Sequence, residues 1–248
     1  MIISVTLNAA MDRTVAVPNF RQGHKHRSVE SRTVPGGKGI NVARALRLLG
    51  RPVIATGLAG GATGDGVLAQ LTEESLLTDF IRIAEETRIN LAVIDPTSNE
   101  QTEINERGPH VRPEELDAFV KRLDYLAGGA TICVLAGSLP PGVDVNTYNR
   151  LVTNLRQRGI TVLLDAEGDA MFSGMRAGPD MVTPSQLEAE ELVGHEFESR
   201  DEVFTALSEL IEMGPSEAAI TLPEGCVAVV GDGPERRMVE VTIDPLDP

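Results

Sequence analysis

The chain contains little cysteine and little positive charge, and each shortage argues against a class of protein. Cys133 and Cys226 are its only cysteines, and two residues so far apart in sequence predict neither a disulfide scaffold nor a cysteine-based metal site. Acidic residues outnumber basic residues by 37 to 22, which gives a formal net charge of −15. This charge argues against a nucleic acid or an anionic membrane as partner, and an anionic substrate would need basic side chains gathered in one place.

Long apolar runs are also absent. No run reaches the length that spans a membrane, and the chain opens directly on the apolar residues 2–7 without the pattern of a signal peptide. We therefore expect a cytoplasmic protein. Its 248 residues, 42% of them hydrophobic, can form one α/β domain, with or without a small appendage. Cys133 lies in an apolar run and is expected to be a buried, reduced thiol.

Apolar, strand-like runs alternate with amphipathic, helix-like segments through most of the chain. Strands are predicted at residues 2–7, 53–58, 131–136, 160–165, 181–183 and 218–222. Helices are predicted at residues 40–49, 65–74, 113–126, 145–158, 186–193 and 201–213. Such alternation indicates a mostly parallel sheet covered on both faces, with ligands gathering beyond the carboxyl ends of its strands.

Two regions interrupt this alternation. Residues 14–17 and 28–34 resemble strands with no helix between them, and residues 88–95 and 101–105 resemble a hairpin around a turn at 96–99. We expect these strands to form a small separate sheet. Glu103 and Asn105 alternate with Ile104, which predicts that both polar side chains lie on one face of a strand.

The most distinctive segment is Pro35-Gly36-Gly37-Lys38-Gly39-Ile40-Asn41, a glycine turn that leads into the helix predicted at 40–49. Glycines let another molecule approach the backbone, and a helix N-terminus offers N–H groups to an anion. The alternative interpretation is a turn that only lets the helix pack tightly against a sheet. The segment is not a nucleotide P-loop, because Gly39 follows Lys38 where that motif requires serine or threonine.

Several motifs together resemble the PfkB (ribokinase-like) carbohydrate kinases, and the similarity extends along the whole chain. They are Val5-Thr6-Leu7-Asn8-Ala9-Ala10-Met11-Asp12-Arg13-Thr14, the glycine turn, Gly60-Gly61-Ala62-Thr63-Gly64-Asp65, Thr87-Arg88-Ile89-Asn90, Thr102-Glu103-Ile104-Asn105-Glu106 and Gly137-Ser138-Leu139-Pro140-Pro141-Gly142. Within this family the chain most resembles the bacterial 1-phosphofructokinases, and next the tagatose-6-phosphate kinases. The resemblance implies a ribokinase-like three-layer α/β/α fold with a mostly parallel central sheet. It also implies a small β-sheet lid, inserted at about residues 13–35 and 87–106.

The resemblance further implies that the protein uses ATP and Mg²⁺ to phosphorylate a furanose phosphate, converting fructose 1-phosphate to fructose 1,6-bisphosphate. Tagatose 6-phosphate and fructose 6-phosphate are alternative substrates. A non-catalytic sugar-phosphate-binding or regulatory protein is an alternative function, and a ribose or nucleoside kinase is less favoured because its substrate lacks a phosphate. A homodimer formed through the lid is also expected.

The expected sugar site combines acceptors for hydroxyl groups with cations for a phosphate. Asp12, just after the first predicted strand, and Asn41, in the first turn of the helix, are expected to bind sugar hydroxyls. Lys25, Arg27 and Arg88 are expected to clamp the phosphate. The full set of expected substrate-binding residues is Asp12, Lys25, Arg27, Gly36, Gly37, Lys38, Asn41, Arg88, Glu103, Asn105 and Ser138.

The nucleotide side departs from the family pattern. By resemblance the expected ATP-binding residues are Asp165, Thr183, Ser185, Glu188, Thr221, Pro223 and Gly225. Glu188 matches the glutamate of the family's N-x-x-E motif, which organises Mg²⁺ through water. Ser185 replaces the asparagine of that motif, Thr183 stands where relatives often have lysine, and Pro223 where glycine is usual. We expect these changes to alter ATP binding.

The sequence ends at Asp244-Pro245-Leu246-Asp247-Pro248, before the G-A-G-D turn that supplies the anion hole and the aspartate base in the family. Asp247 does not match that base. We therefore expect no catalytic base in this chain and interpret it as a fragment of a complete kinase rather than a defective gene product. Loss of the turn is expected to impair phosphoryl transfer, which relies on positioning and charge stabilisation.

Overall fold

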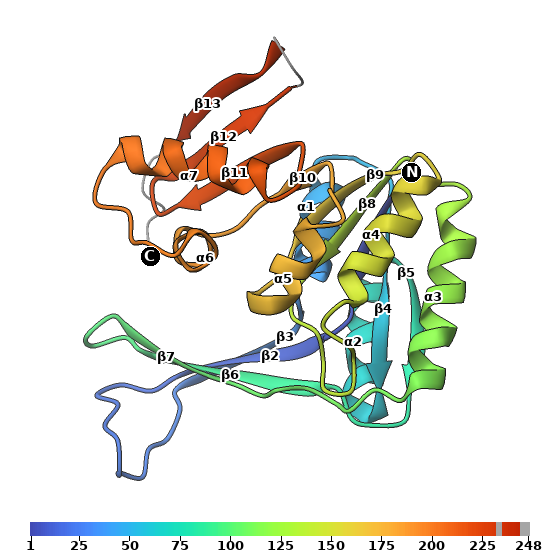
Figure 1. Ribbon diagram of the computed structural model, residues 1–248. Helices are drawn as coiled ribbons and strands as arrows, with labels where there is room; N and C mark the ends of the chain where they lie inside the picture. The colour runs from blue at the N-terminus through green and yellow to red at the C-terminus, as the bar shows by residue number, and fades with distance from the viewer. Residues whose placement is uncertain (232–234, 244–248) are drawn as a thin grey trace. The chain divides into compact units, whose positions relative to one another are not determined.

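The computed structural model describes residues 1–231 and 235–243, and the chain divides into two compact units. The N-terminal unit comprises Ser4–Tyr125 and Leu139–Val143. The C-terminal unit comprises Met1–Ile3, Leu126–Ser138 and the chain from Asp144 onward. Figure 1 labels the helices and strands.

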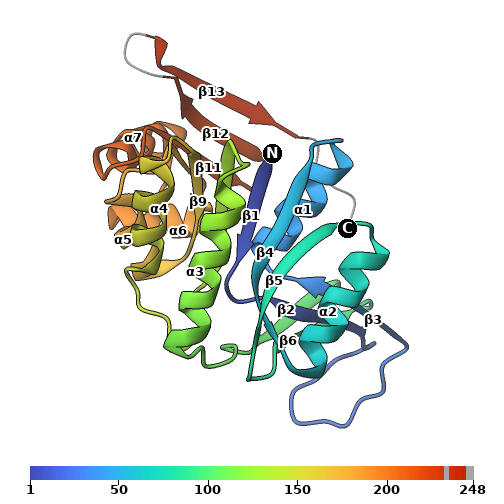
Figure 2. The same ribbon diagram turned by 90° about the vertical axis from the view of Figure 1, so that its right-hand side faces the viewer.

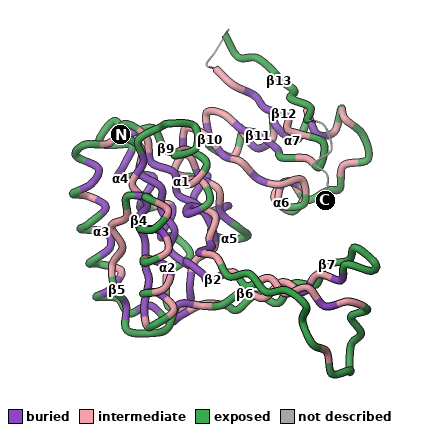
Figure 3. Tube along the Cα trace, turned by 180° about the vertical axis from the view of Figure 1, so that it is seen from behind, coloured by how far each residue is buried: buried purple, intermediate pink, exposed green. Residues whose placement is uncertain are grey.

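In the N-terminal unit the strands of the larger sheet have the order β1-β4-β5, although the first two residues of β1 belong to the C-terminal unit. These strands and the helices of the unit are β1 (Ile2–Thr6), β4 (Val53–Gly60), β5 (Leu77–Ile83), α1 (Lys38–Leu48), α2 (Gly61–Glu73) and α3 (Pro113–Ala127). β4 and β5 pair in parallel, and α2 packs along both (Figure 2). β4 is buried along nearly its whole length (Figure 3), as expected for a strand inside a mostly parallel sheet. Leu58, Leu71 and Phe119 are fully buried in the core of this unit.

A separate four-stranded sheet, in the order β3-β2-β6-β7, also belongs to the N-terminal unit (Figure 1). Its strands are β2 (Ala10–Ala16), β3 (Glu30–Gly36), β6 (Arg88–Asp95) and β7 (Glu100–Asn105). β2 pairs antiparallel with β3 and parallel with β6, while β6 and β7 form the predicted hairpin. The expected small second sheet is therefore confirmed. β2 begins at Ala10 rather than at residue 14, so Asp12 lies inside a strand and not in the turn after β1.

The C-terminal unit contains six strands in the order β13-β12-β11-β10-β9-β8. Its elements are β8 (Ile132–Ala136), α4 (Thr147–Gln157), β9 (Thr161–Asp165), α5 (Gly168–Met175), β10 (Met181–Val182), α6 (Gln186–Val193), α7 (Arg200–Glu212), β11 (Glu217–Leu222), β12 (Gly225–Val230) and β13 (Arg237–Thr242). The strands from β8 to β11 are parallel, and β12 and β13 continue the order antiparallel. Cys133 is a fully buried free thiol, as predicted, and burial raises its pKa.

Three features of the fold differ from the sequence pattern. β5 was not predicted, because polar residues interrupt its apolar positions. α5 was not predicted either, because it has only eight residues and includes two glycines, yet it buries Met171 and Met175. α2 begins at Gly61 rather than at residue 65. The carboxylate of Glu86, distant in sequence, accepts hydrogen bonds from the N–H groups of Ala62 and Thr63 and so stabilises the earlier start.

No helix in the described part of the chain is long and apolar enough to cross a membrane.

Glu115 is a buried carboxylate at the start of α3. It accepts hydrogen bonds from the backbone N–H groups of Ala84 and Arg112, at 2.8 and 2.9 Å, and from Arg112 Nη2 at 2.7 Å. These bonds, above all the one from the Arg112 guanidinium, lower the pKa of Glu115 to about 2. The carboxylate therefore joins the end of β5 to the start of α3 in its ionised form.

Replacing Glu115 by glutamine is expected to lower the free energy of unfolding by about 2 kcal/mol at neutral pH, because charge-assisted hydrogen bonds become neutral ones. The folded pKa lies below the ordinary value of 4.5, so the carboxylate stabilises the fold above pH 4.5 and loses that effect as the pH falls toward 2. Urea unfolding should show that the difference in free energy of unfolding between wild type and Glu115→Gln becomes smaller from neutral to acid pH. The exposed neighbour Glu114→Gln is the control. A difference in free energy of unfolding that stays constant with pH would contradict a stabilising role for the ionised Glu115 carboxylate.

Candidate functional site

A polar cavity of about 370 Å³ lies in the N-terminal unit, lined by β2, β6, β7 and the start of α1. Seven of the expected substrate-binding residues line this polar cavity: Asp12, Gly37, Lys38, Asn41, Arg88, Glu103 and Asn105. Gly36 adjoins it as the last residue of β3. The structure thus brings together residues that are widely separated in sequence, while their role in binding stays a prediction.

The Asp12 carboxylate is fixed by its neighbours in the second sheet. Asp12 pairs with Asn90 on β6, and Asn90 pairs with Asn105 on β7, so three polar residues form one row across the sheet. Asn90 Nδ2 donates a hydrogen bond to Asp12 Oδ1 at 2.9 Å. A Cβ atom at Gly36 would lie 2.0 Å from Asp12 Oδ2. Glycine is therefore required at position 36 to leave room for the carboxylate.

The glycine turn packs closely against a strand, as one interpretation of its sequence expects, while anion binding stays a prediction. Gly37 has a φ of 114°, and a Cβ atom there would lie 2.6 Å from Thr6 Cγ2, so the turn packs closely against β1. No side chain caps the N-terminus of α1, and its early residues Lys38 and Asn41 line the polar cavity. The first turn of α1 therefore offers a positive dipole end at the cavity, which favours an anion.

Charges of both signs meet in the polar cavity. Arg13, Lys38 and Arg88 supply three cations, and Asp12 and Glu103 supply two carboxylates. Arg88 is held in place by main-chain oxygens, since its guanidinium donates to the carbonyls of Asn8 and Glu106 at 3.2 and 2.9 Å. In a chain with a net charge of −15, this is the local gathering of basic side chains that an anionic substrate requires.

Sequence reasoning missed Asn90 as a site residue. Its position two residues after Arg88 on the same strand was an available signal, because residues i and i+2 share a face. The same alternation correctly places Glu103 and Asn105 together, and Asn105 Nδ2 donates to Glu103 Oε2 at 3.5 Å. Asn90 contributes an amide beside Asp12 that orients the carboxylate.

Besides Gly36, three of the expected substrate-binding residues do not line the polar cavity. Lys25 and Arg27 are exposed in the segment between β2 and β3. Asp95 anchors the start of this segment, because its carboxylate accepts hydrogen bonds from the N–H groups of Asn19 and Phe20 at 2.9 and 2.8 Å. Ser138 belongs to the C-terminal unit, in the loop after β8. Substrate binding by these three residues stays a prediction.

The expected nucleotide-binding residues all lie in the C-terminal unit. Ser185, Thr221 and Pro223 line one cavity of about 450 Å³. Glu188 lines another, of about 350 Å³, with Asp169. The remaining three are strand-end residues: Asp165 ends β9, Thr183 follows β10 and Gly225 begins β12.

Gly225 has a structural reason to be glycine. Its φ is 145°, and a Cβ atom there would lie 1.9 Å from the carbonyl oxygen of Val241 on β13. Close pairing of β12 with β13 therefore requires glycine at this position, whatever binds nearby.

Glu188 is held by its own helix. Ser185 and Glu188 form a capping box at the start of α6, in which Glu188 Oε2 accepts hydrogen bonds from the Ser185 backbone N–H at 2.7 Å and from Oγ at 2.8 Å. Serine thus replaces the asparagine of the family motif while still orienting the glutamate. No group of three or more His, Cys, Asp or Glu side chains that could hold a metal occurs among the described residues.

The predicted loss of the catalytic aspartate concerns the end of the chain. Residues 244–248, including Asp247, lie outside the described residues, so that prediction is not tested by the structure.

Known proteins resemble this chain in both sequence and fold. It is 34% identical over 222 residues to the 1-phosphofructokinase of Bacillus subtilis (strain 168), covering 90% of this chain and 72% of the relative. Phosphofructokinase-2 from Escherichia coli, solved in complex with substrates and products, matches with a TM-score of 0.89 and 29% identity, covering 99% of this chain and 80% of that one. Arabidopsis thaliana ribokinase, solved with ribose and ATP, matches with a TM-score of 0.74 at 16% identity, covering 98% and 78%, which shows the fold alone.

The expected ribokinase-like fold is therefore confirmed: mixed α/β, with a large mostly parallel sheet and a small second sheet. The sequence profile of the pfkB family carbohydrate kinases matches residues 3–243, which is nearly the whole chain. Since the motifs, the fold and this profile all agree, the chain belongs to the pfkB family of carbohydrate kinases.

Proposed function

We propose that the protein is an ATP-dependent sugar-phosphate kinase that acts on fructose 1-phosphate and forms fructose 1,6-bisphosphate. The polar cavity carries this proposal, because it combines two carboxylates, amides and cationic side chains around an uncapped helix N-terminus. The 34% identity to a 1-phosphofructokinase supports the choice of substrate. Tagatose 6-phosphate and fructose 6-phosphate are the competing substrates.

In this proposal some side chains of the cavity bind the hydroxyl groups of the sugar, and others bind its phosphate. The Asp12 carboxylate, held by Asn90, accepts hydrogen bonds from sugar hydroxyls, and the amides of Asn41 and Asn105 can donate or accept. Arg88 and the start of α1 receive the phosphate, since both supply N–H donors with positive charge. Lys25 and Arg27 are proposed as additional phosphate ligands. Together these contacts orient the hydroxyl that accepts the phosphoryl group.

Kinases of this family use ATP and a divalent metal, and the C-terminal unit carries the residues proposed to bind them. Mg²⁺ is usually held by one or two carboxylates together with phosphate oxygens and water, and the donors here fit that pattern because Glu188 supplies one oriented carboxylate. When bound, the metal neutralises phosphate charge during transfer. In that chemistry, this chain contributes the Glu188 carboxylate, which Ser185 holds in place.

A non-catalytic sugar-phosphate-binding protein is the second candidate function. Pro223 lines the cavity next to Ser185 and Thr221, and proline has no backbone N–H to donate to a nucleotide. The residues that line the polar cavity, proposed as the sugar site, include no proline. Sugar binding without nucleotide binding would favour this candidate.

Isothermal titration calorimetry separates these alternatives. The protein is titrated with fructose 1-phosphate, tagatose 6-phosphate, fructose 6-phosphate and fructose, and then with ATP in the presence of Mg²⁺. We expect fructose 1-phosphate to bind most tightly and ATP to bind as well. Sugar-phosphate binding without ATP binding would support the second candidate, and the absence of any sugar-phosphate binding would rule out both.

A homodimer formed through the second sheet is a further proposal. Ile89 and Ile104 on β6 and β7 are large apolar side chains that are 41% and 59% exposed. Pairing two such sheets would remove these side chains from water. Sedimentation velocity should detect a dimer, and Ile104→Asp should convert it to a monomer. A wild-type protein that sediments as a monomer at high concentration would contradict the proposal.

A further inference from the structure

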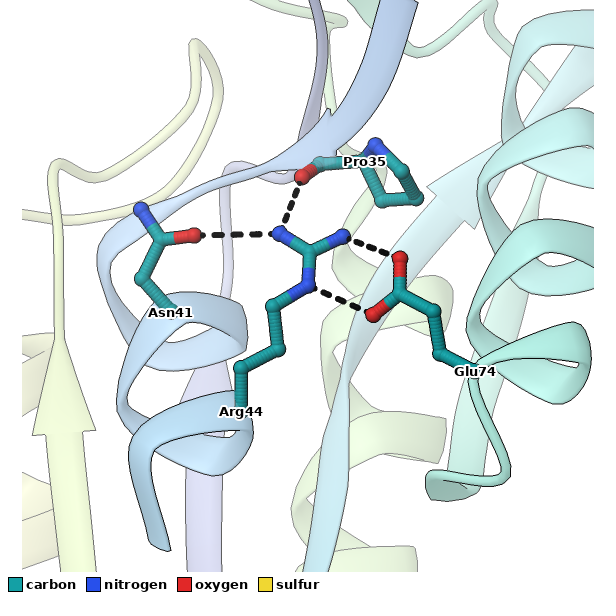
Figure 4. Close-up of polar contacts among 4 residues, drawn as sticks. All are labelled: Pro35, Asn41, Arg44 and Glu74. Carbon is teal, nitrogen blue, oxygen red and sulfur yellow. Dashed lines mark hydrogen bonds and ion pairs between the residues drawn. The ribbon is translucent and has the colours of Figure 1, made fainter. Parts of the chain in front are cut away.

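Arg44 on α1 connects three segments beside the polar cavity (Figure 4). Its Nε and Nη2 atoms donate to the two carboxylate oxygens of Glu74 at 2.6 and 2.7 Å. Its Nη1 atom donates to the carbonyl oxygen of Pro35 at 2.7 Å and to Asn41 Oδ1 at 3.2 Å. The guanidinium therefore connects the end of β3, the first turn of α1 and the end of α2 to one another.

The Arg44–Glu74 pair is a rigid anchor. The contact is bidentate, which fixes the plane of the guanidinium, and the two side chains are 24% and 35% exposed, so water screens them only in part. Arg44 also lowers the pKa of the Glu74 carboxyl, chiefly through its hydrogen bonds. The other edge of the guanidinium is thereby aimed at Pro35 and Asn41.

Asn41 lines the polar cavity, whereas Arg44 does not. Because Asn41 Oδ1 accepts the hydrogen bond from Arg44, the amide group turns its NH₂ away from the guanidinium, as Figure 4 shows. A freely rotating asparagine could offer either its oxygen or its nitrogen to a ligand. With Arg44 in place, Asn41 offers its NH₂ as a hydrogen-bond donor.

We propose that Arg44 is a positioning residue for sugar binding: anchored by Glu74, it sets the Asn41 amide as a donor to a sugar oxygen and holds the glycine turn at Pro35. This inference rests on the proposed function, because it assigns a role within the same sugar site. Arg44 does not line the polar cavity and acts through Asn41. Lysine cannot replace it, because an ammonium group lacks the planar fork that binds Glu74, Pro35 and Asn41 at once.

A double-mutant cycle on sugar binding tests the inference. The dissociation constant for fructose 1-phosphate is measured by calorimetry for wild type, Arg44→Lys, Asn41→Ala and the double variant. Arg122→Lys is the matched control, because Arg122 also pairs with a carboxylate in the N-terminal unit, that of Asp79, but does not line the polar cavity. Thermal melting of each variant reports its effect on the fold. If the Arg44→Lys variant does not fold, Glu74→Gln takes its place in the cycle, because it loosens the same Arg44–Glu74 contact.

We expect Arg44→Lys and Asn41→Ala each to weaken binding about tenfold, the size of one lost hydrogen bond of about 1.4 kcal/mol. The double variant should bind only slightly more weakly than Asn41→Ala alone, because Arg44 then holds only the glycine turn at Pro35. Losses that multiply to about a hundredfold, or an Arg44→Lys variant that binds like wild type, would overturn the inference and leave the proposed function standing. A wild type that binds no fructose 1-phosphate would overturn both.

Discussion

Replacing Asp12 by asparagine is expected to weaken binding of fructose 1-phosphate by about a hundredfold or more. The carboxylate accepts a hydrogen bond from Asn90 Nδ2, and its second oxygen lies over Gly36. An asparagine at position 12 would either set its NH₂ against that of Asn90 or turn its NH₂ toward Gly36 and the ligand. In both arrangements a charged acceptor for sugar hydroxyls is lost, and hydrogen bonds to charged groups contribute about 1.5–3 kcal/mol each.

The measurement is calorimetric titration of Asp12→Asn beside Asp117→Asn. Asp117 is an exposed aspartate on α3 that does not line the polar cavity, so its replacement controls for the change in net charge. Circular dichroism and thermal melting should show that both variants remain folded. If Asp12→Asn binds fructose 1-phosphate as tightly as wild type, the Asp12 carboxylate is not part of the sugar site.

Replacing Arg88 by alanine is expected to weaken the binding of fructose 1-phosphate by about thirtyfold or more. The binding of unphosphorylated fructose should change only about twofold. A guanidinium-to-phosphate contact is charge-assisted and is therefore stronger than a neutral hydrogen bond. Arg88 also holds the carbonyls of Asn8 and Glu106, so its loss will loosen the cavity wall for every ligand. The ratio of the two affinities removes this shared effect and isolates the phosphate contact.

Competition binding with the phosphorylated and unphosphorylated sugar provides that ratio. Arg88→Lys serves as the partner variant, because lysine keeps the charge but not the two-pronged geometry, and it should recover part of the phosphate preference. Raising the salt concentration should weaken fructose 1-phosphate binding in wild type more than in Arg88→Ala. An equal loss for both sugars would show that Arg88 supports the cavity wall without binding phosphate.

Much of the fold could be predicted because it depends on local patterns. The alternation of apolar strands with amphipathic helices is visible within windows of a few residues, and it predicted the parallel strands as well as α3, α6 and α7 within about two residues. The exceptions are elements with weak local signals. Edge strand β5 mixes polar and apolar residues, and α5 is short and contains glycine, so both depend on burial against neighbouring elements.

The candidate site was predictable only in part. Seven expected residues do line one cavity, and the glycine turn indicated where it would form. Asn90 and Arg44 were missed, because each acts through a partner that is distant in sequence: Asn90 through Asp12, and Arg44 through Glu74. Conversely, Lys25 and Arg27 are cationic and match the family, yet they lie on an exposed segment outside the cavity.

The sequence by itself determined the class of fold, the position of the glycine turn before a helix, the buried thiol of Cys133 and the family. The first three follow from periodicity and backbone freedom, which act between residues close together along the chain, and the family follows from the resemblance of the motifs. Only the tertiary structure decided that Asp12, Asn90 and Asn105 form one row, that Gly36 lies beneath a carboxylate and that Arg44 reaches Asn41 and Glu74 together. Strand register and side-chain contacts set those positions, and both depend on residues that meet only when the chain has folded.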